Sequence, residues 1–319
     1  MSMIHKGHIV ESEQSKNANG GTEMMRKRLL DNVDFELLGD VAIHFSRPRH
    51  VPTDVNKNIL YCHDLAQDPE NAVLREKPLI KFDHFVFVSQ WQRDQYIAMY
   101  GLPHSKCSII QNAVETAYEP REKPTEQIRF IYHTTPHRGL ELLYPVFDAL
   151  TKVHDNIHLD VFSSFSIYGW EQRDEPYREL FMELTDHPNI TYHGAQPNEV
   201  VMEALENAHI FLYPCIWQET SCIAMIEAIR SSVLCIHPNI GALGETSANA
   251  TIQYNYNEDK SAHANIAYAY AKQVLDIQKD DPNFLTKMTT SDRAQSYPHS
   301  IDIFKSNWTK LLLELRANG

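Results

Sequence analysis

Residues 209–228 read His209-Ile-Phe-Leu-Tyr-Pro214 and, three residues later, Gln218-Glu-Thr-Ser-Cys-Ile-Ala-Met-Ile-Glu-Ala228. The first run is apolar, which predicts a buried strand that ends in a loop. Further on, isoleucine recurs at positions 223, 226 and 229, and this spacing predicts a helix over Thr220–Arg230. A buried strand followed by a loop and a helix is the repeating unit of a parallel α/β sheet.

Two carboxylates frame this stretch. Glu219 precedes the expected helix and Glu227 lies about two turns along it, so that both can face one cleft. Free backbone N–H groups at the start of a helix suit an anion, above all a phosphate. Acceptors for sugar hydroxyls on either side of a phosphate predict a nucleotide-sugar site. On these two residues alone, a first-turn charge and a solvated side chain remain the simpler interpretation. The neighbouring motifs decide against it.

Length and composition bound the class of protein. A chain of 319 residues is long enough for two α/β domains, and its net charge of −13 argues against nucleic acid as a partner. The five cysteines are scattered without the paired spacing of a zinc or redox site, and none of the 17 histidines is in a His-x-x-x-His or His-Glu-x-x-His pattern, so we expect reduced thiols and no metal site. No apolar run approaches the roughly 20 residues of a membrane span, and the first residues lack the apolar core of a secretory signal. We therefore expect a cytoplasmic protein with at most peripheral membrane association.

Strands and helices are expected to alternate along the chain in two blocks. The first block contains predicted strands near 7–11 and over Phe35–Leu38, Val41–Phe45, Asn58–Tyr61, His84–Val88 and Cys107–Ile110, and a helix over Trp91–Tyr100. The second contains predicted strands over Ile128–Tyr132, His158–Phe162, Ile190–His193, His209–Tyr213 and Val233–Ile236, with helices over Leu140–Thr151, Glu175–Leu184, Glu199–Asn207 and Ala262–Ile277. Such alternation predicts parallel sheets covered on both faces.

The fold class expected is therefore α/β, with two Rossmann-like domains and ligands in the crevice beyond the carboxyl ends of the strands. The segment Glu119–Glu126, with two prolines and several charges, is the best candidate for the linker. We expect domains over 1–122 and 123–300, followed by an amphipathic C-terminal helix within 301–319.

Gly20-Gly21-Thr22 follows the first expected strand and precedes a helix. Paired glycines let the backbone approach a ligand closely and expose N–H groups to a phosphate, although a plain turn is an equally good interpretation. His63 closes the expected strand that ends at Cys62. It can hydrogen-bond a sugar or accept a proton, and a structural role is nearly as well supported.

Thr134, Thr135 and Arg138 occupy the first strand–helix junction of the second domain. Hydroxyl groups, a helix start and a guanidinium converge there, which suits a diphosphate. An arginine in the first helical turn opposes the helix dipole, which favours a functional role over a plain surface charge. The chain contains no Asp-x-Asp motif, so we expect helix dipoles and basic side chains, and no metal cofactor, to neutralise the diphosphate.

The ordered set of motifs resembles the retaining glycosyltransferases of the GT-B fold, specifically glycosyltransferase family 4 (glycosyl transferases group 1). Within that family, Thr134-Thr-Pro-His-Arg-Gly-Leu140 is similar to a Ser/Thr-x-Pro-x-Arg-Gly-Leu subgroup. The motifs that carry the resemblance are Gly20–Thr22, His63, Val88–Asp94, Ile110–Val114, Arg138–Leu140, His193-Gly194, Asn207–Ile210, the Glu219 and Glu227 pair, and Gly244-Glu245.

The resemblance implies a deep inter-domain cleft, an N-terminal domain on the acceptor side, and a C-terminal helix that packs back toward it. It also implies a role for each candidate residue. Glu219 would contact the donor sugar, with the backbone N–H groups of Ser221, Cys222 and Ile223 on sugar and phosphate. Glu227 would bind the ribose hydroxyls, Arg138 would neutralise the diphosphate, Gly20 and Gly21 would close over it, and His63 would lie beside the reacting carbon.

The expected activity is metal-independent transfer of a sugar from a nucleotide-diphosphate sugar to an acceptor hydroxyl, with retention of anomeric configuration. The acceptor would be a glycan, a lipid-linked or a small molecule. Two alternatives remain open: a GT-B sugar-nucleotide epimerase, and a non-catalytic protein that binds nucleotide sugars. The base, the sugar and the acceptor lie beyond what the motifs specify.

Overall fold

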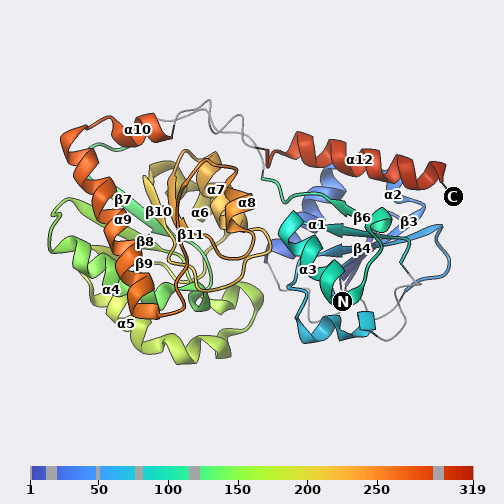
Figure 1. Ribbon diagram of the computed structural model, residues 1–319, viewed down its shortest axis with the longest axis horizontal. Helices are drawn as coiled ribbons and strands as arrows, with labels where there is room; N and C mark the ends of the chain where they lie inside the picture. Colours follow the sequence, from blue (N-terminus) through green and yellow to red (C-terminus); the bar gives the residue numbers. More distant parts are fainter. Residues whose placement is uncertain are drawn as a thin grey trace. The chain divides into compact units, whose positions relative to one another are not determined.

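The computed structural model describes residues 2–11, 20–47, 51–75, 82–114, 123–289 and 298–318. The chain divides into two compact units, coloured along the sequence in Figure 1. The N-terminal unit comprises Met1–Glu115, Glu219–Ile223 and Pro298–Gly319, and the C-terminal unit comprises Thr116–Gln218 and Ala224–Tyr297.

The N-terminal unit is built on a six-stranded sheet in the order β2-β1-β3-β4-β5-β6. Strand β1 pairs antiparallel with β2 and β3, and the strands from β3 to β6 are parallel. The strands are β1 (Ser2–His5), β2 (His8–Glu11), β3 (Val41–Phe45), β4 (Lys57–Cys62), β5 (His84–Phe87) and β6 (Cys107–Ile109). The helices of this unit are α1 (Gly21–Asn32), α2 (Phe35–Leu38), α3 (Gln90–Tyr100) and α12 (Ile301–Ala317).

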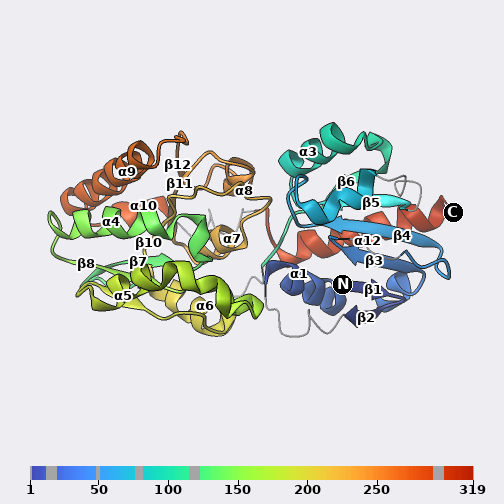
Figure 2. The same cartoon turned by 90° about the horizontal axis from the view of Figure 1, so that it is seen from below.

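Alternation along β4 explains how this sheet is covered. Ile59 and Tyr61 join a cluster with α1 and α12, whereas Leu60 and Cys62 join a second cluster that includes Tyr96 of α3. Successive side chains of a strand point to opposite faces, so a strand buried on both faces needs apolar residues at every position. Figure 2 shows the strands of this sheet side by side, from β2 at one edge to β6 at the other, with α12 passing behind them.

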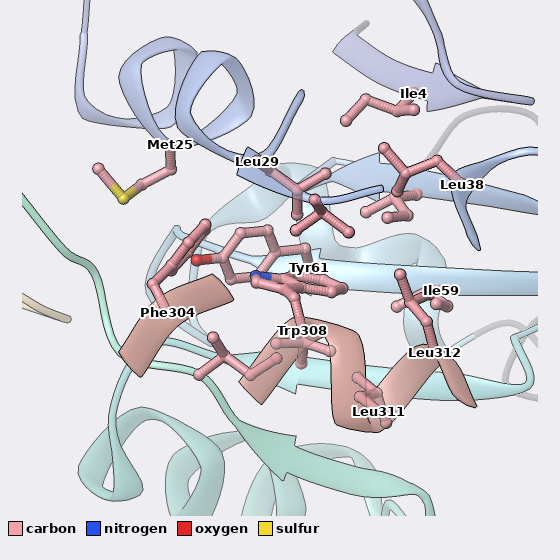
Figure 3. Close-up of a cluster of buried hydrophobic side chains, with 14 of the residues drawn as sticks. Ile4, Met25, Leu29, Leu38, Ile59, Tyr61, Phe304, Trp308, Leu311 and Leu312 are labelled. Carbon is pink, nitrogen blue, oxygen red and sulfur yellow. The ribbon is translucent and has the colours of Figure 1, made fainter. Parts of the chain in front are cut away.

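The C-terminal helix contributes a large part of the first cluster. Phe304, Trp308, Leu311 and Leu312 lie on one stripe of α12 and are all buried. Figure 3 shows these side chains directed at the same cluster as Met25 and Leu29 of α1. The amphipathic pattern of α12 therefore serves the core of the N-terminal unit.

The C-terminal unit contains a six-stranded parallel sheet in the order β12-β11-β10-β7-β8-β9. The strands are β7 (Ile128–Tyr132), β8 (Ile157–Val161), β9 (Ile190–Tyr192), β10 (Ile210–Leu212), β11 (Leu234–Pro238) and β12 (Ile252–Tyr254). The helices are α4 (Leu140–Thr151), α5 (Arg178–Asp186), α6 (Asn198–Asn207), α7 (Ile223–Arg230), α8 (Leu243–Ser247), α9 (Lys260–Asp280) and α10 (Phe284–Met288). Figure 1 shows α4 and α9 on one face of this sheet and α6 and α7 on the other.

Some sequence expectations are wrong in this structure. Phe35–Leu38 forms the short helix α2 and no strand, because the Asp34 side chain accepts a hydrogen bond from the backbone N–H of Glu36 and so caps a helical turn. Helix α7 begins at Ile223, three residues later than the spacing indicates. Strands β1 and β12, the latter short, are not predicted from the sequence pattern.

Several other expectations fall partly outside the described residues. These are the loop before Gly20 and the first half of the expected linker at 119–126. Within the described part of the chain, no helix combines the length and the apolar character needed to cross a membrane.

Candidate active site

The junction between β7 and α4 carries the candidate phosphate-binding residues. After Tyr132 the chain forms a loop and a 3₁₀ turn, Pro136–Arg138, before α4 begins. The Tyr132 hydroxyl donates to the carbonyl of Thr135 (3.2 Å), and Arg138 Nε donates to the Thr135 hydroxyl (3.2 Å). Thr135 therefore orients the guanidinium group of Arg138 beside the N-terminal end of α4. The helix dipole also favours an anion at this end.

A neighbouring hydroxyl at this junction remains available. Thr134 Oγ1 is buried and has no hydrogen-bond partner among the described residues. Since a buried hydroxyl without a partner is costly, it marks a place where a ligand oxygen could be bound. Thr134, Thr135 and Arg138 thus lie in one loop of the C-terminal unit, where a hydrogen bond joins Arg138 to Thr135.

Glu227 lies on the second turn of α7 and is only 4% exposed. The side-chain amide of Asn198, the first residue of α6, donates to Glu227 Oε1 (3.1 Å). The ring of His133, directly after β7, places Nε2 3.6 Å from Glu227 Oε2 and 3.0 Å from the carbonyl oxygen of Ala224. Side chains from two other elements, α6 and the loop after β7, therefore approach this carboxylate.

His133 is neutral at physiological pH, because burial lowers its pKa to about 4. A carbonyl oxygen only accepts, so the proton of the neutral ring is on Nε2 and is donated to Ala224. His133 also precedes the loop that carries Thr134, Thr135 and Arg138. The Glu227 carboxylate and the candidate phosphate site therefore lie at the same end of β7.

Lys123 binds the C-terminal ends of the two helices that carry Asn198 and Glu227. Its ammonium group donates to the carbonyl of Ala208, at the C-terminal end of α6, and to that of Ser231, just after α7 (3.0 Å). A positive charge at two helix C-termini is favourable, although burial lowers the pKa of this lysine to about 7. The lysine thus couples α6 to α7.

The glycine pair opens α1 in the N-terminal unit. Gly20 is buried and precedes the helix, and Gly21 is its first residue. A Cβ atom at Gly21 would lie 2.7 Å from Cδ1 of Ile223, which belongs to the same unit. The second glycine is therefore explained by a close approach within the fold, beside any role toward a ligand.

The segment Glu219–Ile223 is fixed within the N-terminal unit by polar contacts. The Thr220 hydroxyl donates to the carbonyl of His63 (2.8 Å), and the Asn112 side-chain amide donates to the carbonyl of Ser221 (3.3 Å). These bonds hold the backbone before α7 in a non-helical path, which is the physical reason why the helix begins only at Ile223.

The side chains of this segment are mostly enclosed. Glu219, Ser221 and Cys222 are buried, and the hydroxyl of Ser221 has no partner among the described residues. Ser221 lies two residues after Glu219, whose carboxylate is also buried. The segment is therefore polar and yet shielded from bulk water. Such a segment can offer hydroxyl and backbone groups to a polar ligand.

His63 packs among aromatic rings. Its ring lies 4.2 Å from that of Tyr61 and is stacked on Phe45 at 6.0 Å, measured between centroids. Burial lowers its pKa to about 3, and Nε2 has no partner among the described residues. A group with so low a pKa is a weak base, so this environment favours hydrogen bonding over proton abstraction.

No sequence motif points to Asn198 or His133, whose side chains lie against the Glu227 carboxylate. Asn198 lies 29 positions before Glu227, and no spacing rule relates an amide at one helix start to a carboxylate on the next helix. An aromatic group was also missed: His137 stacks on Phe165 at 5.2 Å and meets the edge of Trp217 at 4.9 Å. Within the described ranges no three His, Cys, Asp or Glu side chains are grouped as metal ligands.

Comparison with known proteins identifies the family of this chain. The family named Glycosyl transferases group 1 matches residues 115–281, which is more than half of the chain. The chain belongs to this family. The match covers β7 to α9, and so includes Arg138 and both carboxylates.

The relatives support the fold. The chain is 25% identical over 176 residues to a phosphatidylinositol N-acetylglucosaminyltransferase subunit of Arabidopsis thaliana, covering 52% of the chain and 37% of that protein. It resembles the crystal structure of a glycosyltransferase from Rickettsia africae with a TM-score of 0.62 at 17% identity, covering 97% of the chain and 84% of the relative. It also resembles the pneumococcal O-GlcNAc transferase GtfA in complex with UDP and GlcNAc, with a TM-score of 0.61 at 11% identity, covering 82% and 53%.

Two statements follow from these matches. The expected α/β architecture with two sheet-based units is confirmed and corresponds to the GT-B fold. The chain spans about a third of the length of its curated plant relative and about half of GtfA.

Proposed function

We propose that this protein is a retaining glycosyltransferase of family 4 that transfers a sugar from a nucleotide-diphosphate sugar to an acceptor hydroxyl. The observation that carries the proposal is the buried Glu227 carboxylate at the same end of β7 as Arg138. A carboxylate suits the two hydroxyls of a ribose, and a guanidinium at a helix start suits a diphosphate. UDP, which GtfA binds in its crystal structure, contains both a ribose and a diphosphate.

The C-terminal unit would bind the nucleotide. Glu227 accepts hydrogen bonds from the ribose hydroxyls, while Arg138, the hydroxyls of Thr134 and Thr135 and the N-terminal end of α4 bind the diphosphate. The guanidinium keeps its charge at any physiological pH. It can therefore stabilise the negative charge that develops on the leaving diphosphate without a divalent ion, and we propose a metal-independent reaction.

Residues of the N-terminal unit would act on the sugar and the acceptor. Glu219 positions the donor sugar, with the backbone of Ser221, Cys222 and Ile223 beside it. Gly20 and Gly21 approach the diphosphate, and His63 hydrogen-bonds the sugar. Its lowered pKa argues against a role as the base that takes the acceptor proton.

The bond changes balance without a protein nucleophile. The bond between the anomeric carbon and the phosphate oxygen breaks, and the acceptor oxygen forms a bond to the same face of that carbon. The acceptor proton passes to the departing phosphate oxygen. Retention of configuration follows from attack on the face that the leaving group vacates, and the acceptor is a glycan, a lipid-linked or a small-molecule hydroxyl.

A panel of nucleotide sugars tests the proposal. The protein is incubated with UDP-, GDP- and ADP-sugars, with and without simple sugar acceptors, and release of nucleoside diphosphate is measured. We expect release with one donor class, retained activity after removal of divalent ions by a chelator, and product with the anomeric configuration of the donor. Binding without release would indicate a non-catalytic protein, and an isomerised nucleotide sugar would indicate an epimerase. An inverted product would refute retention.

A further inference from the structure

We propose that Asn198 and His133 are positioning residues that hold the Glu227 carboxylate in the orientation that recognises the ribose of the donor nucleotide. This inference rests on the proposed function, because it assumes that Glu227 binds ribose hydroxyls. It adds two residues to which the sequence motifs assign no role, one on α6 and one after β7.

The two contacts divide the carboxylate between them. Asn198 Nδ2 donates to Oε1 at 3.1 Å, and the protonated Nε2 of His133 lies 3.6 Å from Oε2. The first distance is that of a hydrogen bond, while the second is longer and orients the group electrostatically. A carboxylate has about four acceptor positions, so neither of these two contacts by itself exhausts the acceptor capacity of its oxygen.

The geometry behind the contacts is rigid. The His133 ring donates to the carbonyl of Ala224, one turn before Glu227 on the same helix, and its centroid lies 5.0 Å from that of Phe211. Its position is thus fixed by both the helix that carries Glu227 and the adjacent strand β10. Lys123 also joins the C-terminal ends of α6 and α7, which limits movement of the helix that carries Asn198 against the helix that carries Glu227.

Charge explains why an amide and a neutral ring suit this place. A strong cation against Glu227 would neutralise it and compete with ligand hydroxyls for its lone pairs. Asn198 instead orients the carboxylate through one hydrogen bond from a neutral amide, and the neutral His133 ring lies beside it without a charge. The orientation of the carboxylate is thus set before the nucleotide arrives.

Asn198 provides the cleaner variant, because it is exposed at the first residue of a helix whereas the His133 ring is buried. Asn207→Ala is the matched control: Asn207 ends the same helix, and its amide donates to the carbonyl of Glu203 at 3.1 Å. Neither Asn198→Ala nor Asn207→Ala is expected to unfold the protein, and circular dichroism verifies this.

The experiment compares ribose with deoxyribose. Calorimetric dissociation constants are measured for whichever of UDP, GDP and ADP the wild-type protein binds most tightly, and for its 2′-deoxy and 3′-deoxy forms. We expect the wild type to prefer the ribonucleotide. Asn198→Ala should reduce that preference by about tenfold, the usual effect of losing one hydrogen bond to a charged group, while Asn207→Ala leaves it unchanged.

A double-mutant cycle separates positioning from plain structural support. If Asn198 acts through Glu227, then adding Asn198→Ala to Glu227→Gln should cause no further loss of ribose preference. Full, additive losses in the double variant, or an undiminished preference in Asn198→Ala, would overturn the inference. A wild-type protein that binds the deoxy forms as tightly as the ribonucleotide would instead refute the proposed role of Glu227. Absence of any nucleotide binding would refute the proposed function itself.

Discussion

The backbone of Gly139 passes so close to Pro214 that a Cβ atom at this glycine would lie 2.3 Å from the Pro214 carbonyl oxygen. Gly139 also has φ of 121°, a conformation that side chains other than glycine rarely adopt. The contact joins the loop after β7 to the loop after β10, and Ile216 strengthens it by donating to the carbonyl of Arg138 (3.3 Å). The residue next to the candidate phosphate-binding arginine is therefore fixed by close packing.

Gly139→Ala should destabilise the C-terminal unit by several kcal/mol, about 1–3 for the backbone strain alone, and should also weaken nucleotide binding because Arg138 must move. Urea denaturation and calorimetric titration with nucleoside diphosphate measure the two effects. Gly169→Ala is the control, because Gly169 also has positive φ but nothing lies within 4 Å of its Cβ position. Equal losses in the two variants would contradict the importance of the Pro214 contact.

Much of the fold could be predicted from local patterns. Strand β7 and helix α4 have the predicted bounds of 128–132 and 140–151, since a short, mainly apolar run and a longer segment whose apolar residues recur with helical spacing are local signals. The errors arise where a contact overrides the pattern. Asp34 caps a helical turn in an apolar run, and Thr220 and Ser221 are held by hydrogen bonds to distant residues, so that α7 begins late.

In the candidate site, too, contacts within one loop could be predicted and contacts between distant elements could not. Thr135 and Arg138 could be grouped from the sequence because they share one loop, and the structure joins them by a hydrogen bond. Asn198 could not be connected to Glu227, because their contact depends on how α6 and α7 pack in three dimensions. Burial is likewise hidden: nothing in the sequence indicates that the His63 ring is enclosed by aromatic neighbours.

Arg138→Ala should weaken binding of nucleoside diphosphate about 10- to 100-fold while leaving the unphosphorylated nucleoside nearly unaffected, because the guanidinium acts on the phosphates. Arg138→Lys should fall between the two, since an ammonium keeps the charge and loses the planar donor pair. Calorimetry with both ligands distinguishes these effects. Arg178→Ala is the control, as this arginine is exposed and pairs with Glu175 on the surface. A parallel loss for nucleoside and diphosphate would contradict the phosphate assignment.

His237 should make the protein less stable in mild acid. The ring is fully buried, donates from Nδ1 to the Pro238 carbonyl (2.9 Å) and accepts at Nε2 from the Thr251 hydroxyl (2.7 Å). Burial lowers its pKa to about 4, so between pH 6.5 and 4 the unfolded chain takes up a proton that the folded protein excludes. Stability therefore falls as the pH falls through this window.

For His237 alone, the loss between pH 7 and pH 5 is about 2 kcal/mol in the free energy of unfolding. Urea denaturation of the wild type and of His237→Gln at both pH values isolates this contribution, since all other titrating groups are shared. The variant should lose about 2 kcal/mol less than the wild type over this interval, even though it starts from a lower stability at pH 7. Identical losses would show that His237 takes up its proton equally well in the folded state.

Trp308 should be the most sensitive position of α12. It is fully buried, with its ring centroid 5.1 Å from that of Tyr61, and its indole N–H has no partner among the described residues. Trp308→Ala should destabilise the N-terminal unit by about 3–5 kcal/mol through the cavity it leaves. Trp308→Phe should cost clearly less, because it keeps an aromatic ring and removes a buried donor without a partner.

Leu313→Ala is the control for this prediction. The Leu313 side chain is 51% exposed on the same helix, so this variant should stay within about 0.5 kcal/mol of wild type. Hydrogen exchange, followed segment by segment, reports each unit separately, and equal loss of protection in both units would contradict the assignment of α12 to the N-terminal core.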